Sequence, residues 1–556
     1  MPKLKPLVYR KMLPINKYRF SNRLFTSRLS AWPLATITAL LPERAATPAA
    51  QRPLGAQPLP TQPQPAPAWV LPLLVVFVLV NLGLAFFRSY HLRLDGDIAP
   101  IVLPRADYAH VLHDPFGWAV LTQNSLYAGP NRFFAHIAMY TYWRNVPLLL
   151  QAFLSPIDSL YAAQALFNTV VQGLLLYVMG WYATGTRRLR SGRLWLAMAL
   201  MAPFFQTTGY NRQMAIMDNS VTYNFFYALP LLLLLVLLWP IYRPLSQGQP
   251  VRLSGVQLVA MLLLALVLSF NGPIITGTVL VLLLGISLHW GHQHWQQPVG
   301  QWLRDLPWRP ALLWGWFGVL CLYSLYIGRN NSENITTMTV SVAERYKLLP
   351  HGVLAILTYR LGLPLLIAGC LVNLWLVRRL LPPTAENRRL APILSWIGIF
   401  AVVYSLLLPL GGYRPYRAYI LHHDCVVPIT AALVAFYALT AVRLLSQLRG
   451  SQQRWYIGVL LIIAGVYMNA DRRLYIYGVK APQYQALQLL AQPDAPAVVQ
   501  FPHQARVLTW DPVTEPVSAL TSAEMLRYWR VTNGLKLFYF PPYQEDTLLE
   551  RGDDQL

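Results

Sequence analysis

Two carboxylates, Asp95 and Asp97, lie in the segment His-Leu-Arg-Leu-Asp-Gly-Asp, shortly after a long apolar run. With a glycine between them in a loop, their side chains can point the same way. A carboxylate near a low-dielectric region can serve as general base toward a hydroxyl, and a pair can hold a divalent cation. The alternative is a solvated turn in which an Asp caps the next helix. The pair is the first candidate catalytic site, and also the only candidate metal site.

A second group of candidate residues lies in the segment 411–424, which is rich in arginine, tyrosine and histidine. Guanidinium groups match phosphate oxygens in a planar fork, and aromatic rings stack on sugar faces. The alternative is an interfacial belt of Arg and Tyr, which membrane proteins use routinely. The candidate substrate- or phosphate-binding residues here are Tyr413, Arg414, Tyr416, Arg417 and His422.

Five more positions are candidates for contacts with substrate. Arg345 and Lys347 follow a polar segment that could close over a substrate or simply be solvated. Arg212 and Asp218 share another polar stretch, where a structural ion pair is an equally good interpretation. His136 stands among apolar residues, which favours a packed histidine over a catalyst.

The elements that must position these residues are membrane helices. The 556-residue chain is 55% hydrophobic and only 12% charged, whereas soluble domains carry about 25% charged residues. Apolar runs long enough to cross a bilayer predict an all-α polytopic membrane protein with about eleven transmembrane helices. Their approximate limits are 68–87, 159–183, 193–209, 222–242, 255–270, 273–290, 310–328, 352–377, 391–410, 425–444 and 455–470. The run 133–154 is the candidate for a re-entrant or interfacial helix.

Lys and Arg number 45 against 22 acidic residues, a net charge of +23. No nucleic-acid-binding module accompanies this charge, so we attribute it to the positive-inside bias and to contact with anionic membrane lipids. Arginines cluster after the second, eighth and tenth predicted spans. The N-terminus is therefore expected inside, in the cytoplasm, and the C-terminus outside. In a bacterium this would be the inner membrane.

Three regions are expected along the chain. Residues 1–67 form a basic, Pro-rich tail whose composition predicts a disordered cytoplasmic segment. Residues 68–470 form the transmembrane domain, with a long first outward loop at 88–158. Residues 471–556 are expected to form a small α+β extracytoplasmic appendage with strand-like runs at 497–501, 506–510 and 535–540 and a helical patch at 522–530.

This arrangement, a first outward loop bearing an acidic pair directly after the first span and a C-terminal outward domain, resembles the GT-C superfamily of membrane glycosyltransferases. The resemblance covers residues 68–470. It implies a lipid-linked sugar as donor, with a polyprenyl phosphate carrier, and a lipid or glycan acceptor. It also implies that Asp95 or Asp97 is the catalytic carboxylate. The sequence departs from the family pattern because a glycine separates the acidic residues and no second clear acidic motif is present, Asp218 being the nearest candidate.

Three other functions remain open at this stage. A transporter predicts ionisable residues within the spans, and the predicted spans contain few away from their ends. A polysaccharide polymerase or ligase would use the Arg-rich loops without needing the Asp pair. A non-catalytic scaffold would bind a partner through its tail.

Overall fold

The computed structural model describes residues 67–104, 107–205, 216–294, 298, 306–333, 340–358, 361–414, 417–472 and 476–540. The predicted N-terminal tail up to residue 66 lies outside these ranges, and so do two candidate site residues, Arg212 and Tyr416. Everything below concerns the described residues.

Long apolar helices dominate the structure, as the composition predicts, and identify an integral membrane protein that is mostly helical. Eight of the described helical segments are long and apolar enough to cross a bilayer. They are α2 (Val70–Tyr90), α7 (Pro156–Thr184), Val221–Ser246, α12 (Pro273–His294), α14 (Trp308–Gly328), α16 (Gly362–Leu380), Ala385–Gly411 and α19 (Val427–Gln447). The segment Val221–Ser246 joins α9 (Val221–Tyr223), the π-helix η3 (Asn224–Ala228) and α10 (Leu229–Ser246), and Ala385–Gly411 joins α17 (Ala385–Arg388), α18 (Leu390–Leu407) and η5 (Leu408–Gly411).

The predicted number of eleven spans is not reached among the described residues. The described part of the predicted span 193–209 is the short helix α8 (Gly192–Met201) with η1 (Ala202–Phe205), and 206–209 lie outside the described residues. The predicted span 255–270 is α11 (Gly255–Ser269). The 15 residues of α11 measure about 22 Å, less than the roughly 30 Å of a hydrocarbon core. The predicted span 455–470 is α20 (Gly450–Arg472), which is not among the eight.

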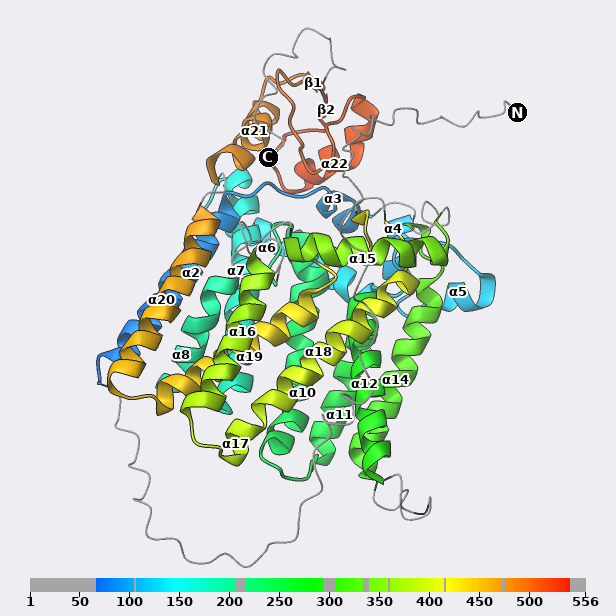
Figure 1. Cartoon of the computed structure of the whole chain (residues 1–556). Coiled ribbons are helices and arrows are strands. Elements are labelled where there is room, and N and C mark those ends of the chain that lie inside the picture. Colours follow the sequence, from blue (N-terminus) through cyan, green and yellow to red (C-terminus); the bar gives the residue numbers. More distant parts are fainter. Residues whose placement is uncertain are drawn as a thin grey trace, which may run out of the picture. The chain divides into compact units, whose positions relative to one another are not determined.

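The predicted span 352–377 is wrong in its first part. α15 (Val342–Thr358) ends there, and α16 begins separately at Gly362. Figure 1 shows α15 lying across the bundle, whereas α16 runs along it. Pro364 fits the first turn of α16, where a missing N–H costs no hydrogen bond. Hydropathy cannot detect this break because the residues on both sides of it are largely apolar.

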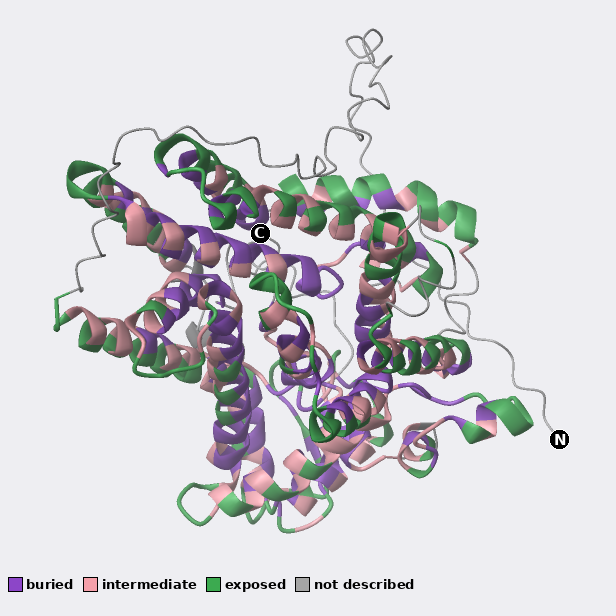
Figure 2. Ribbon diagram, turned by 90° about the horizontal axis from the view of Figure 1, so that it is seen from below, coloured by how far each residue is buried: buried purple, intermediate pink, exposed green. Residues whose placement is uncertain are grey.

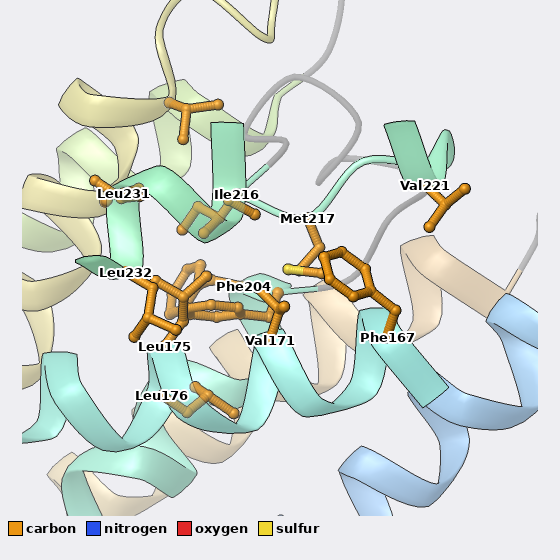
Figure 3. Close-up of a cluster of buried hydrophobic side chains, with 14 of the residues drawn as sticks. Phe167, Val171, Leu175, Leu176, Phe204, Ile216, Met217, Val221, Leu231 and Leu232 are labelled. Carbon is orange, nitrogen blue, oxygen red and sulfur yellow. The ribbon is translucent and has the colours of Figure 1, made fainter. Parts of the chain in front are cut away.

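Two central helices hold the bundle together. In the apolar 18-residue stretch of α7 and in that of α19, 67% of the residues are buried. The corresponding share is 11% in α2 and in Ala385–Gly411, whose apolar side chains face outward. Figure 2 shows buried residues on the inward helix faces and exposed ones on the outer faces. In Figure 3, Val171 and Leu175 of α7 lie beside Phe204 of η1 and Leu232 of α10, and the ring of Phe167 lies beside Met217.

Local signals in the sequence set the ends of α7. The Ser155 side chain accepts a hydrogen bond from the backbone N–H of Asp158, and Pro156 occupies the first helical position. Gly185 ends the helix in the left-handed region at φ 71°, which glycine adopts without steric cost. These two ends place the first loop and an arginine-rich turn at opposite ends of the bundle.

The predicted first outward loop contains four helices. They are α3 (Ile98–Val102), α4 (Asp107–His113), α5 (Trp118–Gln123) and α6 (Phe133–Leu150). The apolar run 133–154 is thus helical over Phe133–Leu150, and α6 is not among the eight candidate spans.

The C-terminal segment packs on this loop, at the same end of the bundle (Figure 1). It contains α21 (Ile476–Ala491), β1 (Val498–Gln500), η7 (Pro516–Ala519), α22 (Leu520–Tyr528) and β2 (Leu537–Tyr539). β1 and β2 form a parallel pair, and the strand-like run 506–510 forms no strand. The Gln483 side chain accepts from the N–H of Leu94 at 2.8 Å and donates to its carbonyl at 2.9 Å, which ties α21 to the residue before Asp95.

Candidate active site

Asp95 is a buried anchor between the first loop and the start of α9. Its Oδ2 accepts from the hydroxyl of Ser220 at 2.6 Å and the N–H of Thr222 at 3.1 Å. Its Oδ1 accepts from the Thr222 hydroxyl at 2.8 Å and the N–H of Asp97 at 3.1 Å. Burial raises the pKa of Asp95, and these four donors oppose the rise. With both oxygens doubly occupied, Asp95 fixes the loop rather than facing a substrate.

Asp97 is the carboxylate of the pair that remains accessible. It is half-buried, and its Oδ1 accepts from the indole N–H of Trp510 at 2.7 Å. Burial and the charge of Asp95 raise the pKa of Asp97 to about 7, against the opposing effect of the Trp510 hydrogen bond. A carboxylate with this pKa exchanges protons readily near neutral pH, which is the property required of a general base.

Gly96 permits the close contact that brings Trp510 to Asp97. A Cβ atom at position 96 would lie 2.4 Å from the backbone nitrogen of Trp510 and 2.7 Å from the carbonyl carbon of Thr509. Only glycine therefore allows the C-terminal segment to lie flat against this turn. The glycine that separates the two acidic residues is explained by this packing.

A second charged cluster influences Asp97 electrostatically. Glu333, at the end of the segment after α14, pairs with Arg132 at 3.5 Å and with Arg414 at 3.2 Å. Arg414 also donates to the carbonyl of Glu333, and the Tyr108 hydroxyl lies 3.5 Å from its carboxylate. Burial would raise the pKa of Glu333, but the two guanidinium groups outweigh it and hold the pKa below its usual range. The charge of Glu333 raises the pKa of Asp97 and that of Arg132 lowers it, so the cluster acts on Asp97 through its electric field.

The segment 417–424 supplies a third set of charges, which meets the turn before α9. Buried Asp424 binds the guanidinium of Arg417 and accepts from Nδ1 of His422 at 2.7 Å. Burial would raise the pKa of Asp424, but Arg417 and His422 hold it well below its usual range. His423 donates from Nε2 to Asp218 at 3.1 Å.

Aromatic residues connect this third cluster to Asp97. Arg417 donates to the Tyr227 hydroxyl at 3.2 Å, and the rings of Tyr227 and Tyr223 lie 5.6 Å apart. The Tyr223 ring in turn lies 6.3 Å from that of Trp510. Asp218 is linked to Asp95 through Ser220, whose N–H donates to Asp218 and whose hydroxyl donates to Asp95. The first loop, the start of α9 and the segment before α19 thus meet in one polar region.

The remaining candidates lie apart from this region or have structural contacts. Arg345 donates to the carbonyls of Val340 and Pro409, and Lys347 is exposed on α15. Tyr413 is half-buried beside Arg414 in the chain. His136 is buried, its Nδ1 lies 3.0 Å from the Arg132 carbonyl, and burial lowers its pKa to about 4. It therefore supports the cluster in its neutral form.

Five residues of this region were not among the sequence-based candidates: Arg132, Glu333, His423, Asp424 and Trp510. The chain has only 22 acidic residues, so the rarity of such residues could have drawn attention to Glu333 and Asp424. No sequence signal identifies Trp510, which lies 413 positions from Asp97.

The residues present do not fit the divalent cation considered for Asp95 and Asp97. The four hydrogen bonds of Asp95 use its lone pairs. The described residues contain no group of three or more His, Cys, Asp or Glu side chains that could hold a metal ion. We therefore derive no chemical step through a metal.

No family model matches the chain. No curated protein and no solved structure matches it either.

Proposed function

We propose that this chain is an integral membrane glycosyltransferase of GT-C type, which moves a sugar from a lipid-phosphate donor to an acceptor hydroxyl on a lipid or glycan. The observation that carries the proposal is Asp97: a half-buried carboxylate with a pKa of about 7, hydrogen-bonded to Trp510 and subject to the charges of Arg132 and Glu333 at one end of a membrane bundle. In the orientation expected from the loop arginines, this end faces outward and the C-terminal segment lies outside with it.

The proposed reaction is an inverting displacement. The acceptor O–H gives its proton to the Asp97 carboxylate, and the acceptor oxygen forms a bond to the anomeric carbon. The bond from that carbon to the phosphate oxygen breaks, and the lipid phosphate leaves with the electron pair. Asp97 acts as general base, which typically contributes about 10²–10⁴ in rate.

The arginines would stabilise the departing phosphate. Arg132 and Arg414 share the single carboxylate of Glu333, so this group of three side chains carries a net positive charge. Arg417, half-buried beside Tyr227, adds a further guanidinium near the aromatic rings. Charges held in place before the reaction stabilise a transition state without the cost of reorganisation.

The test compares Asp97→Asn with Glu344→Gln, a control at a fully exposed carboxylate on α15. Asparagine keeps the size of the side chain and can still accept from Trp510, so we expect normal folding. Cells that depend on each variant are analysed by mass spectrometry of envelope glycans and polyprenyl-phosphate sugars. We expect Asp97→Asn to lose one glycan addition and accumulate its donor, and Glu344→Gln to match the wild type. An unchanged glycan profile in Asp97→Asn would overturn the assignment.

A further inference from the structure

A cavity lies at the opposite end of the bundle from Asp97, where α7 and α10 both end. Its volume is about 360 Å³. It is lined by Gly185, Thr186, Arg187, Arg188, Trp239 and Arg243. The same end carries the ion pair of Arg443 with Glu386 and the hydrogen bond from Arg389 to the carbonyl of Ser246.

Three of the six lining residues are arginines. Among the described residues, no carboxylate forms an ion pair with Arg187, Arg188 or Arg243. Helix C-termini favour nearby cations, so dipole compensation is the simplest reason for arginines here. Each helix end contributes only about half a negative charge, however, so two ends leave an excess of positive charge beside three guanidinium groups.

An aromatic side chain, Trp239, forms part of the cavity wall. Trp239 is buried, and its indole N–H has no hydrogen-bond partner in the described part of the chain. The guanidinium of Arg187 lies over the rings of Trp181 and Trp239, 5.3 Å and 5.8 Å from their centroids. These contacts hold Arg187 in place at the cavity. An anion in the cavity would compensate the charges of the three arginines.

We propose that this cavity binds a phosphate group, either in the headgroup of an anionic lipid or as a free phosphate compound. Phosphate presents several acceptor oxygens and negative charge, which match the guanidinium groups of Arg187, Arg188 and Arg243. Basic pockets between membrane helices bind phospholipid headgroups in this way. The site lies far along α7 and α10 from Asp97 and does not depend on the proposed transferase activity.

The experiment uses the full chain purified in a neutral detergent. The probes are short-chain phosphatidylglycerol, short-chain phosphatidylcholine and inorganic phosphate, titrated in turn with binding followed by native mass spectrometry. The test variant is Arg187→Gln with Arg188→Gln. The control is Arg378→Gln with Arg379→Gln, which removes two exposed arginines from the last turn of α16, outside the cavity.

We expect saturable binding of an anionic probe, weakened about tenfold or more in the cavity variant and unchanged in the control. The single substitution Arg243→Gln, on α10, should also weaken binding of the anionic probe. Binding of phosphatidylglycerol without inorganic phosphate identifies a lipid headgroup site, and binding of both identifies a site for free phosphate. Equal loss in the cavity and control variants, equal binding of phosphatidylcholine, or no saturable binding would overturn the proposal.

Discussion

Replacing Gly96 with alanine should separate Trp510 from Asp97 without altering either side chain. The new Cβ would lie 2.4 Å from the Trp510 backbone nitrogen, whereas ordinary contact begins at 3.4 Å. The two nearest atoms are backbone atoms of Trp510 and Thr509, which cannot rotate away, so the two segments must move apart by about 1 Å. Overpacking of this kind costs typically about 1–3 kcal/mol.

The displacement should affect both packing and activity. A misplacement of about 1 Å near a reacting group can reduce the rate about 10²-fold. The segment 505–513, which holds Trp510 against the turn, should exchange its backbone amides faster because its closed state is less stable. Hydrogen-exchange mass spectrometry measures this opening in the absence of any substrate.

The matched control is Gly83→Ala in α2, where a Cβ meets no atom within 4 Å. Alanine favours a helix over glycine by about 0.5–1 kcal/mol, so this variant should be neutral or slightly stabilised. If Gly96→Ala exchanged amides in 505–513 at the wild-type rate, the close contact between the two segments would be refuted.

Further substitutions test single contacts of the site. Trp510→Phe removes a hydrogen bond that lowers the pKa of Asp97, so activity should rise at a higher pH than in the wild type in a pH–rate profile. Ser220→Ala removes a donor to buried Asp95 and should cost about 1–3 kcal/mol of stability, measured by denaturant unfolding, with no gain at any pH. Lys480→Met removes an ammonium group packed on three tyrosine rings and should cost about 0.5–2 kcal/mol in the same assay.

The membrane character and most helix positions were predictable, because long apolar runs in the sequence indicate membrane helices directly. The break before Gly362 was not, since the hydropathy on its two sides is alike and only Pro364 hints at a helix start. The limits predicted for 255–270 agree with α11, but at 15 residues this helix is not among the eight candidate spans.

The candidate site was predictable in its residue types and only partly in its contacts. The sequence offered Asp97 and Arg414 as candidates; Arg414 pairs with Glu333, and the charge of Glu333 raises the pKa of Asp97. It could not separate the roles of Asp95 and Asp97, because that difference comes from Ser220 and Thr222, more than 120 positions away. The spacing of residues around Asp95 in the sequence does not reveal hydrogen-bond partners that are this far away in the chain.

The different surroundings of the two carboxylates make one more prediction. Asp95→Asn replaces an acceptor oxygen with an amide that faces donors, which leaves buried groups unpaired and should cost about 1–3 kcal/mol of stability for each. It also removes a charge that raises the pKa of Asp97. Activity that remains should therefore extend to lower pH, opposite in sign to Trp510→Phe.

The reverse variant, Asp97→Asn, should lose activity at every pH and keep the wild-type stability, since its hydrogen bond to Trp510 can persist. Measuring both stability and pH–rate profiles in the two variants separates the roles. If Asp95→Asn shifted the profile upward, or if both variants lost stability equally, the division into one anchoring and one proton-accepting carboxylate would be wrong. A shift downward with reduced stability requires that Asp95 be ionised beside Asp97, and four converging donors are the arrangement that allows a buried carboxylate to keep its charge.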